Sequence, residues 1–367
     1  MSSDARYMGM ALACARRGAG RTAPNPMVGA VLVRDGVVLA EGHTQPPGSD
    51  HAEPHALRQL GPLGTRAAEG ATLYVTLEPC CHHGRTPPCT DAILASGIRR
   101  VVVGTVDPFP LVAGRGIAQL RAAGVQVDVG VRERECKRLN LGFLRVTTGG
   151  LPEVTLKAGM SLDGRIADGA GASRWITGPA ARASAHRLRD EHDAVLVGIG
   201  TVLADDPSLT TRIPGGRDAV PVVLDSRLRV PDDAALLRAG RRAIVVCAHD
   251  APARDLPADI VRIERAAHGV DVRAALRALG SRGLHRVLVE GGAHVHRALL
   301  DAGVVDRMEL YVNGRVLGGG HAVVAGPGYT LAEAPDFRFT GVEHLGDDLR
   351  LTLEHAGDVD PSAEGGA

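Results

Sequence analysis

The sequence predicts an α/β protein built from two domains. Its 367 residues exceed the usual length of a single domain, and 44% of them are hydrophobic, which is enough to fill two cores. Apolar runs of strand length alternate with segments of helical pattern through both halves of the chain, and that alternation is typical of sheets covered by helices on both faces. The Thr147-Thr148-Gly149-Gly150 segment predicts the boundary, with domains over residues 1–148 and 149–356 and a polar, disordered tail over 357–367.

The elements of the first domain follow from caps, turns and periodicity. Asp4 can cap a helix over residues 4–18, whose apolar residues recur at helical spacing before Gly18 stops it. The pair Asp35-Gly36 predicts a hairpin between two strands. The strands are predicted at 28–33, 37–40, 72–77, 101–105 and 126–129, and the further helices at 51–60, 91–96 and 117–123.

The second domain repeats the alternation with different spacing. Short runs rich in Val, Leu and Ile predict buried strands, and the longer segments between them carry helical periodicity. The strands are predicted at 153–158, 194–197, 220–224, 243–247, 286–290 and 308–312, and the helices at 180–190, 270–279 and 295–301.

Composition excludes several classes of protein. The 42 basic and 42 acidic residues cancel, so no net field favours nucleic acid or an anionic membrane. No apolar run approaches the 20 residues of a spanning helix, and residues 1–10 lack the pattern of a secretory signal. Six cysteines in such a chain do not make a disulfide scaffold. We therefore expect a cytoplasmic protein without nucleic-acid or membrane partners.

The strongest local motif predicts a zinc site. His51-Ala52-Glu53 is followed by Pro79-Cys80 and by Cys89. Catalytic zinc takes three protein ligands, which one His and two Cys supply, and lowers the pKa of its bound water to about 7. Glu53, near the metal but not on it, can shuttle protons. The pattern matches the zinc-deaminase signature, but eight residues rather than two separate the cysteines.

Two alternatives to this reading of the motif remain at this point. One of the neighbouring residues could replace a ligand, and these candidates are Cys81, His82 and His83. A structural zinc clip with four protein ligands is the other alternative, although it would leave Glu53 without a task.

Two strand–glycine–helix joints in the second domain suit a phosphate. Val289-Glu290-Gly291-Gly292 lets a phosphate approach the free N–H groups of a helix start, and Gly198-Ile199-Gly200-Thr201 has the same character. Each joint is equally compatible with a tight turn. Because no G-x-G-x-x-G follows a strand, a Rossmann dinucleotide site is not supported.

These motifs resemble the bifunctional riboflavin biosynthesis deaminase–reductase family. That family joins a cytidine-deaminase-like three-layer αβα domain to a dihydrofolate-reductase-like α/β domain, and the resemblance covers nearly the whole chain. It rests on residues 25–29, 51–53 and 76–89 in the first half, and on 157–165, 173–178, 200–207 and 224–226 in the second.

The resemblance implies roles in a deaminase site. His51, Cys80 and Cys89 would bind zinc and Glu53 would move protons; the implied substrate contacts are Asn25, His82, Arg85 and Asp107. The Arg85 guanidinium suits a phosphate, with a solvated loop arginine as the alternative. Three positions depart from the family pattern: Cys81 replaces the usual Ser, Thr44 a substrate-side His (with His43 one place earlier), and Phe109 an Asn.

The resemblance also implies a reductase site. The implied NADPH contacts are Gly159, Trp175, Thr201, Asp205, Ser226 and Gly292, and the implied sugar-phosphate contacts are Ser173, Arg189, Leu209, Arg212 and Glu290. Lys157 could orient or polarise the sugar near the hydride path. Simpler roles are a turn cap for Asp205, a core position for Trp175 and a surface carboxylate for Glu290.

The resemblance thus predicts two reactions with Zn²⁺ and NADPH as cofactors and a pyrimidine ribonucleotide phosphate as substrate. The first is hydrolytic deamination of 2,5-diamino-6-(5-phosphoribosylamino)pyrimidin-4(3H)-one. The second is reduction of the ribosyl group of 5-amino-6-(5-phosphoribosylamino)uracil to ribityl. A homo-oligomer is compatible with the sequence.

Three alternative functions remain. One differs from this prediction in substrate, and two differ in the class of protein. Thr44 and Phe109 are compatible with a paralogue that acts on a related nucleotide in secondary metabolism. A nucleic-acid base deaminase is disfavoured by the zero net charge and the 2% aromatic content, because bases of a strand stack on aromatic side chains. A zinc-stabilised binding module is the non-enzyme alternative.

Overall fold

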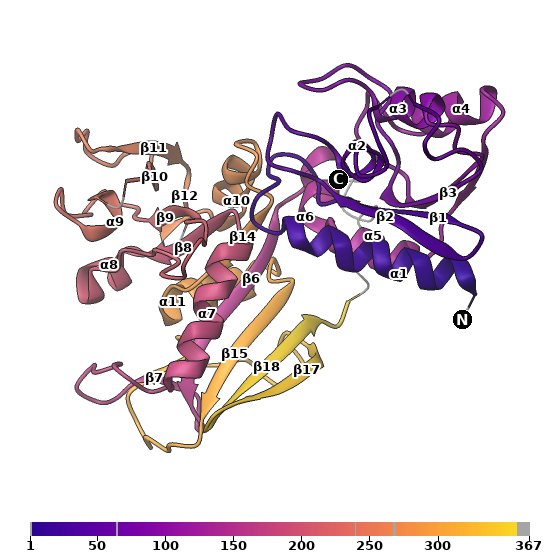
Figure 1. The fold of residues 1–367 in the computed structure, drawn as a ribbon. Helices are drawn as coiled ribbons and strands as arrows, with labels where there is room; N and C mark the ends of the chain where they lie inside the picture. Colours follow the sequence, from indigo (N-terminus) through magenta and orange to yellow (C-terminus); the bar gives the residue numbers. More distant parts are fainter. Residues whose placement is uncertain (1, 64, 239, 267–268, 358–367) are drawn as a thin grey trace. The chain divides into compact units, whose positions relative to one another are not determined.

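The computed structural model describes residues 2–63, 65–238, 240–266 and 269–357, which form two compact units that divide after Gly150 (Figure 1). Apart from Gly357, the tail predicted to be disordered lies outside the described residues. No helix among the described residues is both long and apolar enough to span a bilayer.

The first unit is organised around one five-stranded sheet. The strand order is β2-β1-β3-β4-β5, with β1 antiparallel to both neighbours and β3, β4 and β5 mutually parallel. The helices are α1 (Ser3–Ala15), α2 (Ala52–Leu57), α3 (Cys89–Ala95), α4 (Arg115–Ala122), α5 (Glu133–Leu139) and α6 (Leu141–Thr147), and the strands are β1 (Gly29–Arg34), β2 (Val37–His43), β3 (Thr72–Leu77), β4 (Arg100–Thr105) and β5 (Gln126–Val129).

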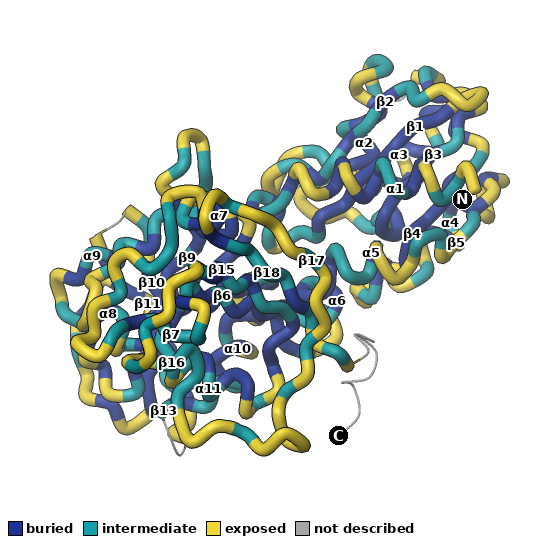
Figure 2. The backbone as a smooth tube through the Cα atoms, turned by 90° about the horizontal axis from the view of Figure 1, so that it is seen from below, coloured by how far each residue is buried: buried dark blue, intermediate teal, exposed yellow. Residues whose placement is uncertain are grey.

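The first unit has three layers, because successive side chains along each strand point to opposite faces of the sheet and helices cover both faces. Val31 and Val33 of β1 pack with Met8 of α1 and with α5, whereas Ala30 and Leu32 face a second cluster formed with α2, α3 and α4. The strands β1, β3 and β4 are accordingly buried along most of their length (Figure 2). The predicted three-layer αβα arrangement is confirmed.

The second unit contains a nine-stranded sheet in the order β11-β10-β9-β8-β14-β6-β15-β18-β17. All neighbours from β11 to β15 are parallel, and β18 and β17 add an antiparallel edge. Its strands are β6 (Glu153–Ser161), β8 (Ala194–Gly198), β9 (Val220–Leu224), β10 (Ala243–Ala248), β11 (Ala258–Ile263), β14 (Arg286–Val289), β15 (Arg307–Asn313), β17 (Phe337–Leu345) and β18 (Asp348–His355).

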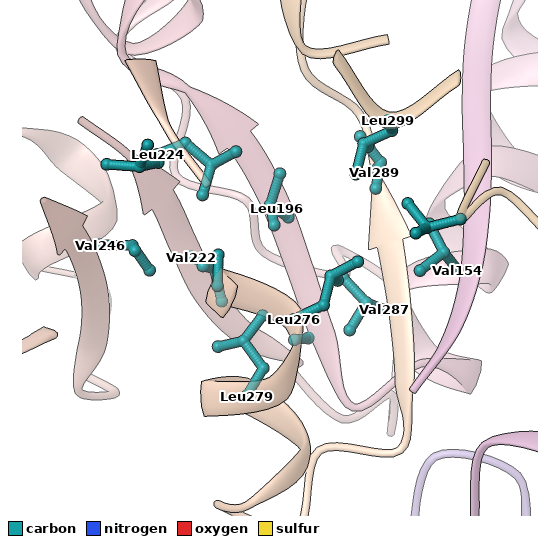
Figure 3. Close-up of a cluster of buried hydrophobic side chains, with 14 of the residues drawn as sticks. Val154, Leu196, Val222, Leu224, Val246, Leu276, Leu279, Val287, Val289 and Leu299 are labelled. Atoms are coloured by element: carbon teal, nitrogen blue, oxygen red, sulfur yellow. The ribbon is translucent and has the colours of Figure 1, made fainter. Parts of the chain in front are cut away.

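Helices cover both faces of this sheet. On one face, α10 and α11 pack on side chains such as Val154, Leu196 and Val287 (Figure 3). On the other face lie α7, α8 and α9, over Val195 and Val197 of β8. The helices are α7 (Pro179–Glu191), α8 (Ile199–Asp205), α9 (Ala235–Arg238), α10 (Val272–Gly280) and α11 (Ala293–Asp301), and short strands pair as β7 (Arg165–Ala167) with β16 (His321–Ala322) and β12 (Arg265–Ala266) with β13 (Gly269–Val270).

The elements that the sequence did not predict are short or polar. Neither α5 nor α6 exceeds seven residues, and α5 carries five charged side chains in its two turns. Strands β17 and β18 form an edge hairpin whose residues are mostly half-buried or exposed, so they show no apolar run. The helix predicted over 51–60 is shorter than expected, because α2 ends at Leu57.

Candidate active sites

Three elements bring the predicted zinc ligands together. His51 is the N-cap residue of α2, Cys80 lies just after β3, and Cys89 begins α3. The donor atoms of these three residues lie within 4.8 Å of one another, with His51 Nδ1 3.3 Å from Cys89 Sγ and 3.6 Å from Cys80 Sγ. Zinc with ordinary bond lengths in tetrahedral geometry separates N and S ligands by about 3.5 Å. The residues therefore fit a zinc ion.

The other residues considered as ligands lie outside this cluster. Cys81 Sγ instead donates to the Leu111 carbonyl over 3.6 Å. Among the described residues, His51, Cys80 and Cys89 are the only three His, Cys, Asp or Glu side chains grouped closely enough to hold a metal. The hydrogen bonds from Cys89 and His51 lower the pKa of Cys80 to about 4, although burial opposes this, so Cys80 is a ready thiolate donor.

Glu53 lies in the first turn of α2, two residues from His51, and both residues line one cavity, which is described below. It is only 3% exposed. Burial, followed by the negative charge of Cys80, raises the pKa of Glu53 to about 7. A carboxyl group with a pKa near neutrality can both accept and return a proton at physiological pH.

The same shift predicts a pH-dependent stability for the metal-free protein. Because the pKa of Glu53 rises from 4.5 to about 7 on folding, the folded state retains a proton that the unfolded chain has released. The stabilisation is complete below pH 4.5 and is lost as the pH rises through 7. The substitution Glu53→Gln removes the cost of ionising a buried carboxyl group. Its effect on the free energy of unfolding, measured in urea, should therefore be more stabilising at pH 8 than at pH 4, by about 3 kcal/mol.

The exposed residue Glu264 provides the control for this measurement. Glu264→Gln should change the free energy of unfolding equally little at both pH values. A Glu53→Gln effect that is the same at pH 4 and pH 8 would contradict the assignment of the shift to Glu53.

A cavity of about 360 Å³ lies against the zinc-ligand cluster and is lined by His51, Cys80 and Glu53. All four predicted substrate contacts of this domain line it, namely Asn25, His82, Arg85 and Asp107. Arg85 is exposed at its rim. The two departing positions that were singled out, Thr44 and Phe109, line it as well. Thr44 Oγ1 accepts a hydrogen bond from the Val28 amide over 3.1 Å, and the Phe109 ring lies 5.6 Å from that of His82.

Glu78 organises one wall of this cavity, a role that sequence reasoning missed. Its carboxylate is buried between β3 and the segment that carries Asp107. Glu78 Oε2 accepts hydrogen bonds from the Asp107 amide over 3.2 Å and the Gly114 amide over 2.9 Å, and Oε1 accepts one from Ile117 over 3.1 Å. An acidic residue directly before Pro79-Cys80 was the available signal, but its partners are 29 to 39 residues away in sequence.

Replacing this carboxylate should destabilise the first unit. In Glu78→Gln the NH₂ group cannot accept from backbone N–H groups, so at least one buried donor loses its partner. We expect a loss of about 2 kcal/mol, seen as a lower melting temperature of the zinc-loaded protein. Glu41→Gln, which removes only a surface ion pair with Arg17, should melt like the wild type. Equal melting of all three proteins would contradict this role.

The second unit holds a buried ionic cluster around Glu290, which follows β14. Arg189 of α7 binds the Glu290 carboxylate in bidentate fashion, with N···O distances of 2.6 and 2.9 Å, and Lys157 Nζ lies 3.5 Å from it. Burial opposes the charged form, but the two cations outweigh it and hold the pKa of Glu290 below its ordinary range. The alternative of a surface carboxylate is therefore wrong.

His186 belongs to the same cluster and was not predicted. It lies on α7 one turn before Arg189. Burial and the charges of Arg189, Arg212 and Lys157 lower the pKa of His186 to about 4, although Glu290 opposes this, so its imidazole is neutral at physiological pH. The i, i+3 spacing to Arg189 was the only signal in the sequence. Leu209, three residues before Arg212, is buried. Both Leu209 and Arg212 have left-handed backbones, with φ of 54° and 58°.

A cavity of about 820 Å³ in the second unit collects part of the predicted NADPH site. Its lining includes Thr201, Asp205, Ser226 and Gly292, together with Ser173, which was predicted on the sugar side. The Gly292 amide donates to Thr201 Oγ1 over 3.2 Å. A Cβ on Gly291 would lie 2.7 Å from the Gly198 amide nitrogen, so the two strand–helix joints require a glycine where they touch.

Two predicted cofactor residues, Gly159 and Trp175, do not line this cavity. Trp175 is 58% exposed, so a core position is wrong, and the Arg182 guanidinium lies 4.5 Å above its ring. Asp205 forms an ion pair with Arg174 at 3.6 Å. The residue at the C-cap of α8 is Asp206, which has a left-handed backbone.

Known proteins match both halves of the chain. Residues 1–105 match the family described as "Cytidine and deoxycytidylate deaminase zinc-binding region", and residues 152–351 match "RibD C-terminal domain". The chain is 41% identical to the riboflavin biosynthesis protein RibD of Escherichia coli K12 over 95% of its length and 99% of the relative's, and 41% identical to RibD of Bacillus amyloliquefaciens over 94% and 95%.

Two solved structures match almost the whole fold. One is a diaminohydroxyphosphoribosylaminopyrimidine deaminase/5-amino-6-(5-phosphoribosylamino)uracil reductase from Thermotoga maritima, with a TM-score of 0.85; the other is RibD of Acinetobacter baumannii, with 0.86. Each is 38% identical in sequence, and each alignment covers 96% of this chain and 98% of the other. The predicted combination of a cytidine-deaminase-like domain with a dihydrofolate-reductase-like domain is confirmed.

Proposed function

Because the chain belongs to the RibD family of bifunctional deaminase–reductases in riboflavin biosynthesis, we propose that its two cavities carry out two successive steps on one pyrimidine nucleotide. The cavity at His51 would deaminate 2,5-diamino-6-(5-phosphoribosylamino)pyrimidin-4(3H)-one. The cluster at Glu290 and the larger cavity would then reduce the ribosyl group of the deaminated product with NADPH.

In the deaminase site, His51, Cys80 and Cys89 would hold the zinc ion. When bound, zinc acts as a Lewis acid that makes a water molecule nucleophilic near neutral pH. Glu53 would accept the proton of the water and return it to the departing amino group, so a C–O bond forms, the C–N bond breaks and ammonia leaves. Asn25, His82 and Asp107 would contact the base and ribose, and Arg85 at the rim suits the phosphate.

In the reductase site, the residues of the Glu290 cluster would bind and orient the ribosyl phosphate. NADPH, when bound, supplies a hydride for C1 of the ribosyl group. Lys157 would stabilise the ring oxygen as the C1–O bond breaks. Arg189 fixes Glu290, and Arg212, Ser173 and Leu209 would complete the contacts with the sugar phosphate. Thr201, Asp205, Ser226 and Gly292 would bind the cofactor in the larger cavity, and Gly159 and Trp175, which do not line that cavity, stay predicted cofactor contacts.

The observation that carries this proposal is the grouping of His51, Cys80 and Cys89 beside a cavity that the buried Glu53 lines together with His51 and Cys80. A zinc clip with a purely structural role gives no reason to bury a carboxyl group against the cluster, because burial of that group costs stability. The six free cysteines are compatible with the predicted cytoplasmic location. A homo-oligomer stays a prediction.

Removal of zinc should separate the two activities. The purified protein should contain about one zinc ion per chain, and a chelator should reduce deamination at least 100-fold while NADPH oxidation on the deaminated nucleotide continues. Metal analysis, ammonia release and absorbance at 340 nm measure the three quantities. Re-addition of zinc should restore deamination. Full deaminase activity in protein shown to contain no metal would contradict the proposed first step.

A further inference from the structure

The ammonium group of Lys157 has a second neighbour besides Glu290. Its Nζ atom lies 3.5 Å from the Glu290 carboxylate, whose two oxygens already accept the shorter hydrogen bonds of Arg189. The same Nζ atom lies 6.0 Å from the centre of the Tyr311 ring, the distance of a cation–π contact. An ion pair as long as the one with Glu290 fixes the ammonium group only loosely. The aromatic ring therefore supplies a second constraint on its position.

The register of the sheet places Lys157 and Tyr311 on one face. In the parallel ladder of β6 and β15, Lys157 pairs with Glu309. Two residues further along, Gly159 pairs with Tyr311. Side chains two residues apart on a strand share a face, and Tyr311 packs on the face that α7 covers. Because Gly159 has no side chain, the neighbouring position on β6 leaves the space between Lys157 and the ring open.

Helix α7 fixes the aromatic ring in place. Tyr311 is only 1% exposed, and its hydroxyl group shares a hydrogen bond of 3.1 Å with the Ser184 hydroxyl group of α7. Arg189, which binds Glu290, lies on the same helix. One helix thus anchors both neighbours of the ammonium group. The Lys157 side chain itself is 20% exposed and stays accessible to a ligand.

We infer that Tyr311 is a positioning residue for the reduction, because the face of its ring holds the Lys157 ammonium group where it can meet the ring oxygen of the ribosyl group. This inference rests on the proposed NADPH-dependent reduction and on the role of Lys157 in it. The buried Tyr311 hydroxyl group is bonded to Ser184 and does not touch the substrate. Burial raises the pKa of Tyr311 to about 12, so the phenol is not a base at neutral pH.

The kinetic test compares three variants of one buried cluster. Tyr311→Phe keeps the face of the ring, whereas Tyr311→Leu removes the ring. Leu236→Ala truncates a fully buried side chain of the same cluster on α9, so it is the control for lost packing. Tyr311→Leu should lower kcat for NADPH oxidation on the deaminated nucleotide about 5- to 30-fold and leave KM nearly unchanged, because a desolvated cation–π contact contributes a factor of this size. Tyr311→Phe and Leu236→Ala should keep the wild-type kcat.

A spectroscopic test does not depend on activity. The chain contains only two lysines, Lys137 and Lys157, so labelling with ¹³C-lysine gives two sets of side-chain NMR signals, and Lys157→Met assigns them. Protons over the face of an aromatic ring are shifted upfield. The ε-methylene protons of Lys157 should therefore resonate upfield of those of Lys137 in the wild type and in Tyr311→Phe. In Tyr311→Leu they should move toward the position of Lys137.

The outcomes separate this inference from the proposed function. A wild-type kcat in Tyr311→Leu, an equal fall in Leu236→Ala, or a fall in kcat without a shift of the Lys157 signal would overturn the positioning role. If Tyr311→Leu is insoluble, Tyr311→Met also lacks the ring and carries the same expectation. A wild-type protein that oxidises no NADPH with the deaminated nucleotide would instead overturn the proposed reduction.

Discussion

Glu53→Gln should reduce the rate of deamination by about 10²- to 10⁴-fold, the range typical of a lost general acid–base group. The glutamine has nearly the same volume and keeps the cavity closed, but it cannot take up a proton from water or return one to the leaving amine. The burial that raises the pKa of Glu53 to about 7 is the physical reason that this carboxyl group suits the task. Ammonia release under saturating substrate measures the loss.

Two controls distinguish chemistry from structural damage in this variant. The zinc content should stay near one per chain, because Glu53 is not in the cluster of donor atoms. Reduction of the deaminated nucleotide should proceed at the wild-type rate, because the two cavities lie in separate units. A zinc-loaded Glu53→Gln protein that releases ammonia at the normal rate would show that another group moves the proton.

Lys157→Met should have the corresponding effect on reduction, with a loss of about 10²- to 10³-fold in kcat. Removal of a single fixed donor that stabilises a developing negative charge on oxygen typically lowers kcat by a factor of this size. Lys157 is suited to this because its ammonium group lies 3.5 Å from the buried Glu290 carboxylate, which holds it beside the proposed sugar site. NADPH oxidation on the deaminated nucleotide measures the effect.

The chain supplies a matched control for this variant. Lys137 is its only other lysine, and it pairs with Glu133 on the surface of α5 over 2.9 Å. Lys137→Met should reduce the nucleotide normally. If Lys157→Met raised KM for the nucleotide without lowering kcat, Lys157 would be a binding residue rather than a residue that acts on the reacting atoms.

The deaminase site could be predicted well because its motifs are compact. His51 and Glu53 lie two residues apart, and Cys80 and Cys89 nine apart, so local spacing carried most of the information. Glu78 was missed because its hydrogen-bond partners lie in a later segment of the chain, and no local pattern indicates which carboxylate will accept them. The buried strands were predicted for the same reason as the motifs, since each is a continuous apolar run.

The reductase site was harder to predict because its residues are dispersed. Arg189 and Glu290 are 101 residues apart, and only the packing of α7 against the end of β14 joins them. His186 carries no motif and enters the cluster through helical spacing alone. The edge strands β17 and β18 were missed because exposure on their faces removes the apolar pattern from the sequence.

The central claim is that one chain first deaminates and then reduces the same nucleotide. Incubation of the purified protein with 2,5-diamino-6-(5-phosphoribosylamino)pyrimidin-4(3H)-one, with and without NADPH, tests it directly by mass spectrometry. Without NADPH, we expect only the deaminated product, one dalton heavier, because an amino group is exchanged for a hydroxyl group. With NADPH, the product should gain two further daltons as the ribosyl group becomes ribityl. A reduced product that still carries the second amino group, or unchanged substrate in both incubations, would contradict the claim.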